Sequence, residues 1–232
     1  MPRTKQPIEA RPVPPGSMTE DAAQGGDKER EFMKIVCTDL EGVLVPEIWI
    51  NVARKTGIEE LKLTTRDISD YDVLMRKRLE ILKHHGLKLK DITDVIATMA
   101  PLDGALDFLT WLRERTQVII VSDTYVEFAK PLMAKLGWPT LLCNSLSIDD
   151  TGAIADYHLR QKDGKRHVVL AMQGLNYEVI AMGDSYNDIS MLETAQHGIL
   201  FRPPETIKTE YPGFPVTETY DQLRREFTRL LE

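Results

Sequence analysis

The sequence predicts an α/β protein in which a doubly wound parallel sheet carries a small helical cap, inserted after its first strand. Short apolar runs at 35–37, 118–121 and 179–182 have the length of buried strands, and a glycine, a hydroxyl or an acid soon follows each run. Helical patterns separate the runs, as expected of a parallel sheet with helical crossovers. The region from 47 to 100 has helical patterns and no convincing strand, so we expect it to form the cap.

Residues 1–32 differ in composition from the rest of the chain. Proline and glycine are frequent and apolar side chains are sparse, which discourages both helices and strands. No apolar run typical of a secretion signal is present, and the acidic side chains argue against a transit peptide. We predict a disordered N-terminal extension, which a translation start assigned too far upstream of Met33 would explain. A regulatory arm is the alternative.

Proline and glycine mark the limits of the cap. Pro46 ends the loop after the first strand, and a helical pattern covers 47–56. Pro101 and Gly104 mark the return to the core, where 102–115 has the pattern of a crossover helix. The predicted domains are the extension at 1–32, the core at 33–46 and 101–232, and the cap at 47–100.

The second half of the chain continues the alternation of strands and helices. The stretch 149–152 interrupts an extended segment with acids and a glycine, which is typical of a hairpin turn. After the second strand, the predicted elements are a helix at 126–136, a strand at 140–142, a hairpin at 148–159, a helix at 165–175, a strand at 179–182 and an edge strand at 198–201.

The composition argues against several kinds of partner. A formal net charge of -7 disfavours a surface for nucleic acid or for an anionic membrane. No apolar run is long enough for a membrane-spanning helix, and no Cys or His spacing typical of a zinc site is present. Cys37 lies in an apolar run and Cys143 follows one, so we expect buried, reduced thiols and a cytoplasmic protein.

Asp39 and Glu41 lie just after the first predicted strand, at the edge where open α/β sheets bind ligands. In an extended chain, residues i and i+2 point to the same side, so both carboxylates can face one pocket. Gly42 lets the chain turn away without a side chain in the site. Two acids this close resist ionising together unless a cation or a shared proton relieves them. The spacing therefore suggests a divalent metal and a different role for each acid.

Two further polar clusters follow the other predicted strands. The stretch Gly183–Asp188 follows one strand with acids and a glycine, and Ser122, Asp123 and Thr124 follow the other. An acidic turn at a strand end is the simpler interpretation of any one of these motifs. Three such clusters at one edge of a sheet favour a common site instead.

These motifs resemble those of the haloacid dehalogenase-like phosphohydrolases. The correspondence places the nucleophile loop at Asp39–Val43, the serine motif at Ser122, the lysine motif at Lys165 and the acidic motif at Gly183–Asp188. Within that superfamily the chain is most similar to phosphoserine phosphatases, and in particular to bacterial members that also transfer phosphate to homoserine. The likeness runs from Met33 to near the C-terminus.

Three stretches carry most of the narrower likeness, Asp39–Glu47, Gly183–Asp188 and Tyr71–Met75. One departure from the wider superfamily is Glu41, because its second carboxylate is usually an aspartate. The extra methylene lengthens the reach of this acid from the backbone.

The resemblance implies a Rossmann-like core and a mechanism of phosphate-ester hydrolysis. It assigns Asp39 as the nucleophile that forms an aspartyl-phosphate, and Glu41 as general acid and then general base. Mg²⁺ is the implied cofactor, held by Asp39 and Asp184, by the backbone carbonyl of Glu41 and by water. The other implied site residues are Ser122, Asp123 and Lys165 around the phosphate, Asn187 near the substrate, and Asp188 as a support for Lys165 or for a water ligand.

Arg78 lies within the apolar face of the helical pattern at 71–85, where a guanidinium needs an anion. A carboxylate within the cap, or a stem that reaches water, is one explanation. The resemblance implies another, in which Arg78 binds a carboxylate of the substrate and Glu47 binds its ammonium group. Glu47 also suits the first turn of a helix, whose dipole favours an acid. Together the two residues favour an amino-acid phosphate such as phosphoserine.

Several alternatives stay open at this point. Lys162 competes with Lys165 as the phosphate-binding lysine, and Ser122 has the alternative role of a helix N-cap. Water as acceptor gives a phosphatase of serine biosynthesis, whereas homoserine gives a phosphotransferase of threonine biosynthesis. Another small phosphate ester as substrate and a non-catalytic binding protein are the remaining interpretations, and the sequence leaves a homo-oligomer open.

Overall fold

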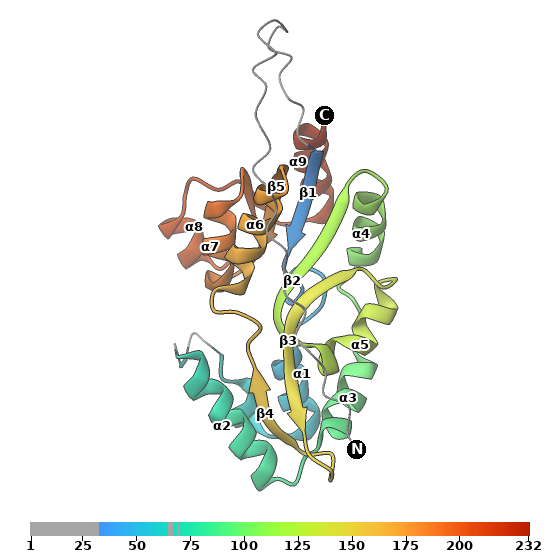
Figure 1. Cartoon of the computed structure of the whole chain (residues 1–232), viewed down its shortest axis with the longest axis vertical. Helices are drawn as coiled ribbons and strands as arrows, with labels where there is room; N and C mark the ends of the chain where they lie inside the picture. The colour runs from blue at the N-terminus through green and yellow to red at the C-terminus, as the bar shows by residue number, and fades with distance from the viewer. Residues whose placement is uncertain (1–32, 65–66, 69) are drawn as a thin grey trace, which may run out of the picture. The chain divides into compact units, whose positions relative to one another are not determined.

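The computed structural model describes residues 33–64, 67–68 and 70–232 (Figure 1). The predicted N-terminal extension at 1–32 lies outside the described residues. The strands form one sheet in the order β4-β3-β2-β1-β5-β6-β7. Their bounds are β1 (Met33–Thr38), β2 (Gln117–Tyr125), β3 (Thr140–Ile148), β4 (Ile154–His158), β5 (Tyr177–Gly183), β6 (His197–Phe201) and β7 (Val216–Thr217).

The strand β1 lies between β2 and β5 and runs parallel to both. Cys37 pairs with Ile119 on one side and with Ala181 on the other. The neighbouring strands are parallel throughout the described sheet except for β3 and β4, which form an antiparallel hairpin. The strands that follow β1 in the sequence are added first on one side of it, as β2, β3 and β4, and then on the other side, as β5, β6 and β7. The carboxyl ends of β1 and β5 therefore form the switch point, where such sheets bind ligands.

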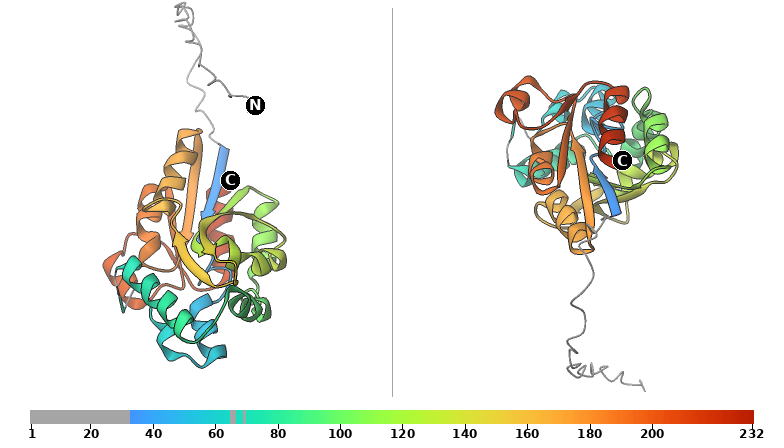
Figure 2. Two further views of the ribbon diagram at one scale, coloured as in Figure 1. Left: turned by 60° about the horizontal axis from the view of Figure 1, so that its bottom comes forward. Right: turned by 90° about the horizontal axis from the view of Figure 1, so that it is seen from above.

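Helices cover both faces of the sheet (Figure 2). They are α4 (Ala105–Arg113), α5 (Val126–Lys135), α6 (Gly164–Gly174), α7 (Ile189–Thr194), α8 (Glu205–Glu210), α9 (Tyr220–Leu231) and the 3₁₀ turn η2 (Tyr186–Asp188). Side chains alternate along β1, so Val36 packs in the core with α4, α5 and α9, whereas Ile35 and Cys37 pack with α6, α7 and α8. The predicted doubly wound α/β class is confirmed.

The segment between β1 and α4 is the one predicted to form a cap, and we use that name for it; its described elements are all helical. Its elements are α1 (Ile48–Thr56), the 3₁₀ turn η1 (Glu59–Lys62), α2 (Tyr71–His84) and α3 (Leu89–Thr98). The helix α2 begins where the side chain of Asp70 accepts a hydrogen bond from the backbone of Val73. None of the described helices is both long and apolar enough to cross a membrane.

Three strand predictions are wrong in their extent or position. The strand β2 continues past Val121 to Tyr125, with a shift of register, and β3 continues past Leu142 to Ile148. Tyr125 at the end of β2 still pairs in parallel with Asn144, and from Ser145 onward β3 pairs in antiparallel with β4. The predicted edge strand, β6, has a neighbour on each side, since β7 pairs with its outer edge.

The hairpin of β3 and β4 supports the cap. Arg76 of α2 forms an ion pair of 2.8 Å with Asp156 of β4, and the hydroxyl of Tyr157 donates a hydrogen bond to Asp72. At the tip of the hairpin, the backbone N–H of Leu89, the first residue of α3, donates to the carbonyl of Gly152 over 3.0 Å. The cap therefore packs against the antiparallel β3–β4 hairpin, an addition to the core that a purely parallel sheet would lack.

Candidate active site

The loop after β1 places Asp39 at the switch point between β1 and β5. The backbone N–H of Asp39 donates to the carbonyl of Met182 over 3.0 Å, which fixes the start of the loop. Gly42 then turns the chain with a φ of 76°, in the left-handed region that favours glycine. A Cβ atom on Gly42 would lie 2.4 Å from Oδ2 of Asp184. Glycine is needed here both for the turn and for the close approach.

Lys165 lies among three acids at this point, of which Asp39 and Asp188 are buried. Its Nζ lies 3.0 Å from Oδ1 of Asp39, 2.7 Å from Oδ1 of Asp188 and 3.9 Å from Oδ2 of Asp123. Burial by itself would lower the pKa of Lys165, but Asp188 and Asp39 raise it well above its usual value. The ammonium therefore stays charged although it is almost fully shielded from water.

The carboxylate of Asp39 is crowded by other acids. Burial, followed by the charge of Asp188, raises its pKa well above the usual value, and Lys165 offsets part of this effect. Asp184 raises the pKa further. An acid in these surroundings ionises more readily when another cation is nearby.

The donor set fits a divalent cation. Asp39, Asp184 and Asp188 each offer a carboxylate oxygen, and these oxygens lie within 4.8 Å of one another. The oxygens of Asp188 already accept hydrogen bonds, Oδ1 from Lys165 over 2.7 Å and Oδ2 from the backbone of Asp184 and Ser185 over 3.0 Å. Asp188 thus suits the role of a support, whereas Asp39 and Asp184 suit Mg²⁺, which prefers oxygen ligands.

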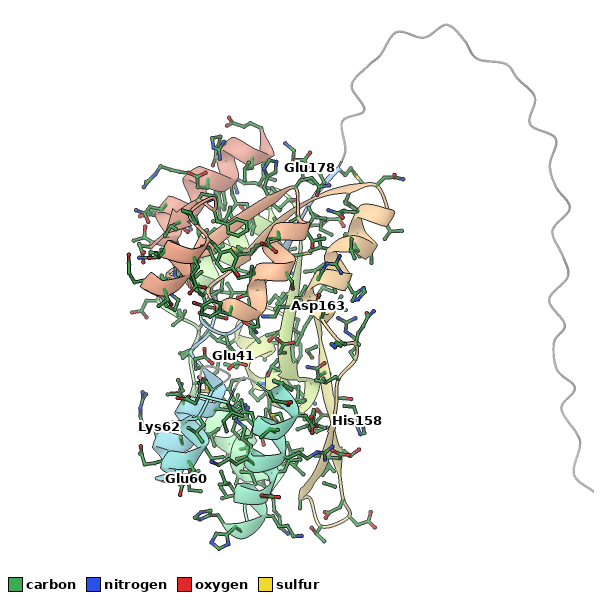
Figure 3. All side chains as sticks on the ribbon, turned by 90° about the vertical axis from the view of Figure 1, so that its left-hand side faces the viewer. Glu41, Glu60, Lys62, His158, Asp163 and Glu178 are labelled. Carbon is green, nitrogen blue, oxygen red and sulfur yellow. The ribbon has the colours of Figure 1, made fainter. Side chains whose placement is uncertain are left out.

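Glu41 lines the same cavity as Asp39 but turns toward the cap. Its Oε2 accepts a hydrogen bond of 2.7 Å from the backbone N–H of Ile48, the first residue of α1. Burial, followed by the charge of Glu47, raises the pKa of Glu41 to about 8. Figure 3 shows Glu41 between the cap helices and the sheet, whereas Glu178 lies at the far end of the sheet. A protonated carboxyl group is therefore available at neutral pH where the cap meets the core.

Ser122 is buried beside this cluster and lies within β2. Its hydroxyl oxygen accepts a hydrogen bond of 3.2 Å from the backbone N–H of Thr124. The helix α5 begins at Val126 after Tyr125, with no side-chain cap, so the interpretation of Ser122 as its N-cap is wrong. The hydroxyl proton of Ser122 can still be donated into the cavity that it lines.

The two competing lysines differ in burial. Lys165 lies in the first turn of α6 and lines the same cavity as Asp39. Lys162 precedes that helix, is exposed and lines a neighbouring cavity instead. On the same side, Nδ2 of Asn187 donates to Oδ2 of Asp123 over 2.9 Å. Of the two lysines, Lys165 is therefore the one that lies beside Asp39 in this cavity.

The cavity above these residues has a volume of about 440 Å³ and extends from the strand ends to the cap. Most of the site residues predicted from the sequence line it together. They are Asp39, Glu41, Glu47, Arg78, Ser122, Asp123, Lys165, Asp184 and Asn187, whereas Asp188 lies behind the cavity wall.

Arg78 lies in the cap wall of the cavity, and only 7% of it is exposed. Its Nη2 donates to the carbonyl of Leu63 over 2.7 Å, and its guanidinium carbon lies 4.6 Å from the ring centre of Trp49. Its buried Nε has no hydrogen-bond partner in the part of the chain that the structure describes. No carboxylate among the described residues forms an ion pair with Arg78. The explanation of its burial by a partner acid within the cap therefore does not apply to the described residues.

Sequence reasoning did not assign several further residues that line the cavity, among them Trp49, Tyr71, Tyr125 and Arg202. The hydroxyls of Tyr71 and Tyr125 lie 2.8 Å apart, which ties the cap helix α2 to the end of β2. Trp49 and Tyr71 lie on helix faces whose pattern also suits core residues. Arg202 directly follows the apolar run of β6, and that position, shared with the polar residues after β1, is the signal that would have indicated it.

Comparisons with known proteins agree with this geometry. A family model described as haloacid dehalogenase-like hydrolase matches residues 33–196. A Pseudomonas aeruginosa protein named phosphoserine phosphatase ThrH is 61% identical over 197 residues, which cover 85% of this chain and 96% of that protein. A phosphoserine phosphatase of Pseudomonas syringae pv. tomato is 58% identical over 85% of this chain and 83% of its own length.

Solved structures share the fold. A phosphoserine phosphatase in apo form has a TM-score of 0.69 at 24% identity, over 86% of this chain and 100% of its own. A substrate-bound phosphoserine phosphatase complex has a TM-score of 0.66 at 23% identity, over 86% of this chain and 99% of its own. At these identities the likeness concerns the arrangement of strands and helices.

Proposed function

Since the chain belongs to the haloacid dehalogenase-like hydrolase family, we propose that it is a phosphoserine phosphatase. It hydrolyses O-phospho-L-serine to L-serine and phosphate through an aspartyl-phosphate on Asp39. The observation that carries the proposal is the cavity that joins Asp39 and Lys165 to Glu47 and Arg78. An amino-acid phosphate needs partners for a phosphate, an ammonium and a carboxylate, and this one cavity offers all three.

In the first step, a carboxylate oxygen of Asp39 attacks phosphorus, and the bond from phosphorus to the serine oxygen breaks. The ammonium of Lys165, 3.0 Å from Asp39, offsets the charge of the phosphoryl oxygens. The hydroxyl of Ser122 donates a hydrogen bond to one of them. Glu41 gives its proton to the departing serine oxygen, and a pKa of about 8 keeps that proton in place beforehand.

In the second step, water takes the place that serine has left. Glu41 is now a carboxylate, and it accepts a proton from the water as the water oxygen attacks phosphorus. The bond between phosphorus and Asp39 breaks, which releases phosphate and restores the free carboxylate. Glu41 is protonated again at the end, so the two steps return the site to its starting state.

Mg²⁺ is the cofactor in this proposal, held by the carboxylates of Asp39 and Asp184 and by the backbone carbonyl of Glu41. The close group of carboxylate oxygens and the raised pKa of Asp39 support it. When bound, the ion offsets negative charge on the phosphoryl group and on the surrounding acids. Asp188 keeps Lys165 and the backbone of Asp184 in position through its two oxygens.

The amino-acid part of the substrate lies against the cap in this proposal. Arg78 binds its carboxylate with the planar fork of the guanidinium, and Glu47 binds its ammonium group. Asn187 contacts the substrate from the side of Asp123. The desolvated guanidinium, which has no carboxylate partner among the described residues, supports this assignment, since a buried cation gains from an arriving anion.

The same aspartyl-phosphate can pass its phosphoryl group to homoserine. An in-line displacement brings the incoming alcohol to the position that serine has left, so homoserine uses Glu47 and Arg78 as well. Glu41 then accepts the proton of the homoserine hydroxyl instead of a proton of water. The likeness of Asp39–Glu47 to bacterial enzymes of both activities supports this second reaction.

Phosphorus NMR of L-phosphoserine with Mg²⁺, with and without L-homoserine, tests both reactions. We expect free phosphate in the first sample, and phosphohomoserine in addition in the second. Free phosphate alone in both samples would limit the protein to hydrolysis. No turnover of phosphoserine in either sample would overturn the substrate assignment.

Two variants test the assigned residues in the same assay. Asp39→Asn removes the nucleophile, and full activity in that variant would contradict the covalent mechanism. Arg78→Ala removes the partner of the substrate carboxylate. Phosphoserine turnover that survives Arg78→Ala unchanged would favour another small phosphate ester as the natural substrate.

A further inference from the structure

Arg78 is held in the cavity wall in an unusual way for a buried arginine. Buried guanidinium groups are normally paired with a carboxylate. Glu41 and Glu47 act on Arg78 electrostatically, but neither forms an ion pair with it. Among the described residues, the guanidinium donates one hydrogen bond to an oxygen, from Nη2 to the carbonyl of Leu63 over 2.7 Å. Its Nη1 contacts the sulfur of Met75 over 3.6 Å.

The missing counter-charge is replaced by an aromatic face. The guanidinium carbon lies 4.6 Å from the ring centre of Trp49, within the distance at which a cation is attracted to an indole face. Such attraction is strongest when both groups are shielded from water, and here 7% of Arg78 and 9% of Trp49 are exposed. A ring face attracts the positive charge of Arg78 but accepts no hydrogen bonds from its N–H groups. Those N–H groups therefore remain available to bind an arriving carboxylate.

The indole itself is fixed from the core. Trp49 lies on α1 and meets the ring of Phe128 on α5 edge to face, with ring centres 5.6 Å apart. Phe128 in turn meets Tyr125 edge to face at 5.5 Å, and Tyr125 also lines the cavity. The position of Arg78 is therefore tied through aromatic contacts to the end of β2, beside the phosphate-binding residues.

We propose that Trp49 is a positioning residue for the substrate carboxylate, because it holds Arg78 desolvated, charged and free to bind an anion. This inference rests on the proposed function and adds a determinant of specificity to it. Trp49 favours phosphate monoesters whose alcohol bears a carboxylate beside the ammonium group. A carboxylate side chain in its place would pair with Arg78 and occupy the fork that the substrate needs.

The test compares O-phospho-L-serine with O-phosphoethanolamine, which lacks only the carboxylate. Trp49→Leu removes the ring face, and Trp49→Phe keeps a smaller one. We expect Trp49→Leu to raise KM for phosphoserine about tenfold with little change in kcat, as loss of a desolvated cation–π contact predicts. We expect kcat/KM for phosphoethanolamine to stay within about twofold, since that substrate makes no contact with Arg78.

Two controls separate positioning from general damage. Trp138→Leu makes the same change at a tryptophan that is 62% exposed, and it should leave both substrates unaffected. In an Arg78→Met background, Trp49→Leu should have no further effect on KM for phosphoserine, because the group that it positions is gone. Trp49→Phe should restore most of the preference for phosphoserine, and it serves as the test if the leucine variant does not fold.

The outcomes are distinct. An equal loss for both substrates, or an unchanged KM for phosphoserine in both Trp49 variants, overturns the role of Trp49 and leaves the proposed function standing. Failure of the unaltered protein to hydrolyse phosphoserine overturns the proposed function itself. A loss confined to phosphoserine, and absent without Arg78, supports the inference.

Discussion

At Gly42 a single methyl group would meet the carboxylate of Asp184. Gly42→Ala forces a non-glycine residue into the left-handed region, which costs about 1–2 kcal/mol of unfolding free energy. Its Cβ, 2.4 Å from Oδ2, also displaces Asp184. We expect phosphatase activity to fall by about tenfold or more, with a higher Mg²⁺ concentration for half-maximal activity, because small displacements at a reacting centre have large effects on rate.

Gly57→Ala is the matched control for this substitution. Gly57 has a similar φ of 73°, but apart from its chain neighbours no described residue has an atom within 4 Å of the position that an added Cβ would take. We expect a comparable loss of stability in urea unfolding and unchanged kinetics. Equal kinetic effects of the two substitutions would show that crowding at Asp184 is unimportant.

Lys165→Met removes the cation between Asp39 and Asp188. Removal of one partner from a buried ion pair typically costs about 3–5 kcal/mol of unfolding free energy. Burial and the neighbouring acids hold the pKa of Asp39 above that of the unfolded chain, so its protonated form favours folding and this stability is lost as the pH rises. We therefore expect urea unfolding to show a deficit in Lys165→Met that grows from pH 5 to pH 8, together with loss of phosphatase activity.

Lys162→Met tests the competing lysine under the same conditions. Lys162 is exposed, so the substitution should change neither stability nor KM appreciably. Loss of activity in Lys162→Met, with Lys165→Met still active, would reverse the assignment of the two lysines.

At the scale of single residues, the sequence could reveal much of the site because Asp39, Ser122 and Asp184 lie within two residues after apolar runs. That position brings them to one edge of the sheet whatever the details of packing. Trp49 could not be found in this way, since an apolar residue on an amphipathic helix has the same pattern whether it packs in the core or faces a cavity. Only the contact with Arg78, distant in the sequence, distinguishes the two.

At the scale of elements, the contact of α2 with the β3–β4 hairpin offers a direct test. Tyr157→Phe removes the hydroxyl that donates to Asp72, with little change in volume. We expect a loss of about 1 kcal/mol of unfolding free energy, as for an average hydrogen bond, and a higher KM as α2 loosens around Arg78. Tyr177→Phe, whose hydroxyl contacts Gln117 near the opposite end of the sheet, should leave KM unchanged.

The same elements show why strand ends were hard to predict. The polar run after Val121 has the composition of a loop, yet β2 continues through it because β3 lies alongside and pairs with Tyr125. The short strand β7 contains only Val216 and Thr217, too few for a periodic pattern, so β6 was expected at the edge. In both cases the extent of the strand depends on pairing with a strand distant in the sequence, and the local sequence does not show that pairing.

At the scale of the whole molecule, burial of both cysteines makes a simple prediction. It raises the pKa of Cys37 to about 12 and that of Cys143 to about 11, so at pH 8 both thiols remain protonated. The thiolate is the reactive form, and we expect the native protein to react very slowly with a disulfide reagent such as DTNB. Two thiols should become titratable in guanidinium chloride. Rapid reaction of the native protein, or fewer thiols after unfolding, would contradict this.

The cap touches the core at more places than its two chain connections. It bonds to the tip of the β3–β4 hairpin and to the middle of β4, and its wall residue Trp49 is braced by α5. Caps can be exchanged between related proteins by recombination in evolution or by protein engineering. Such an exchange therefore transfers a working recognition surface only when the hairpin and the facing part of α5 are exchanged together with the cap. In this chain the residues that determine substrate choice come from several separate segments of the sequence. A division of the sequence into cap and core would separate some of these segments from one another.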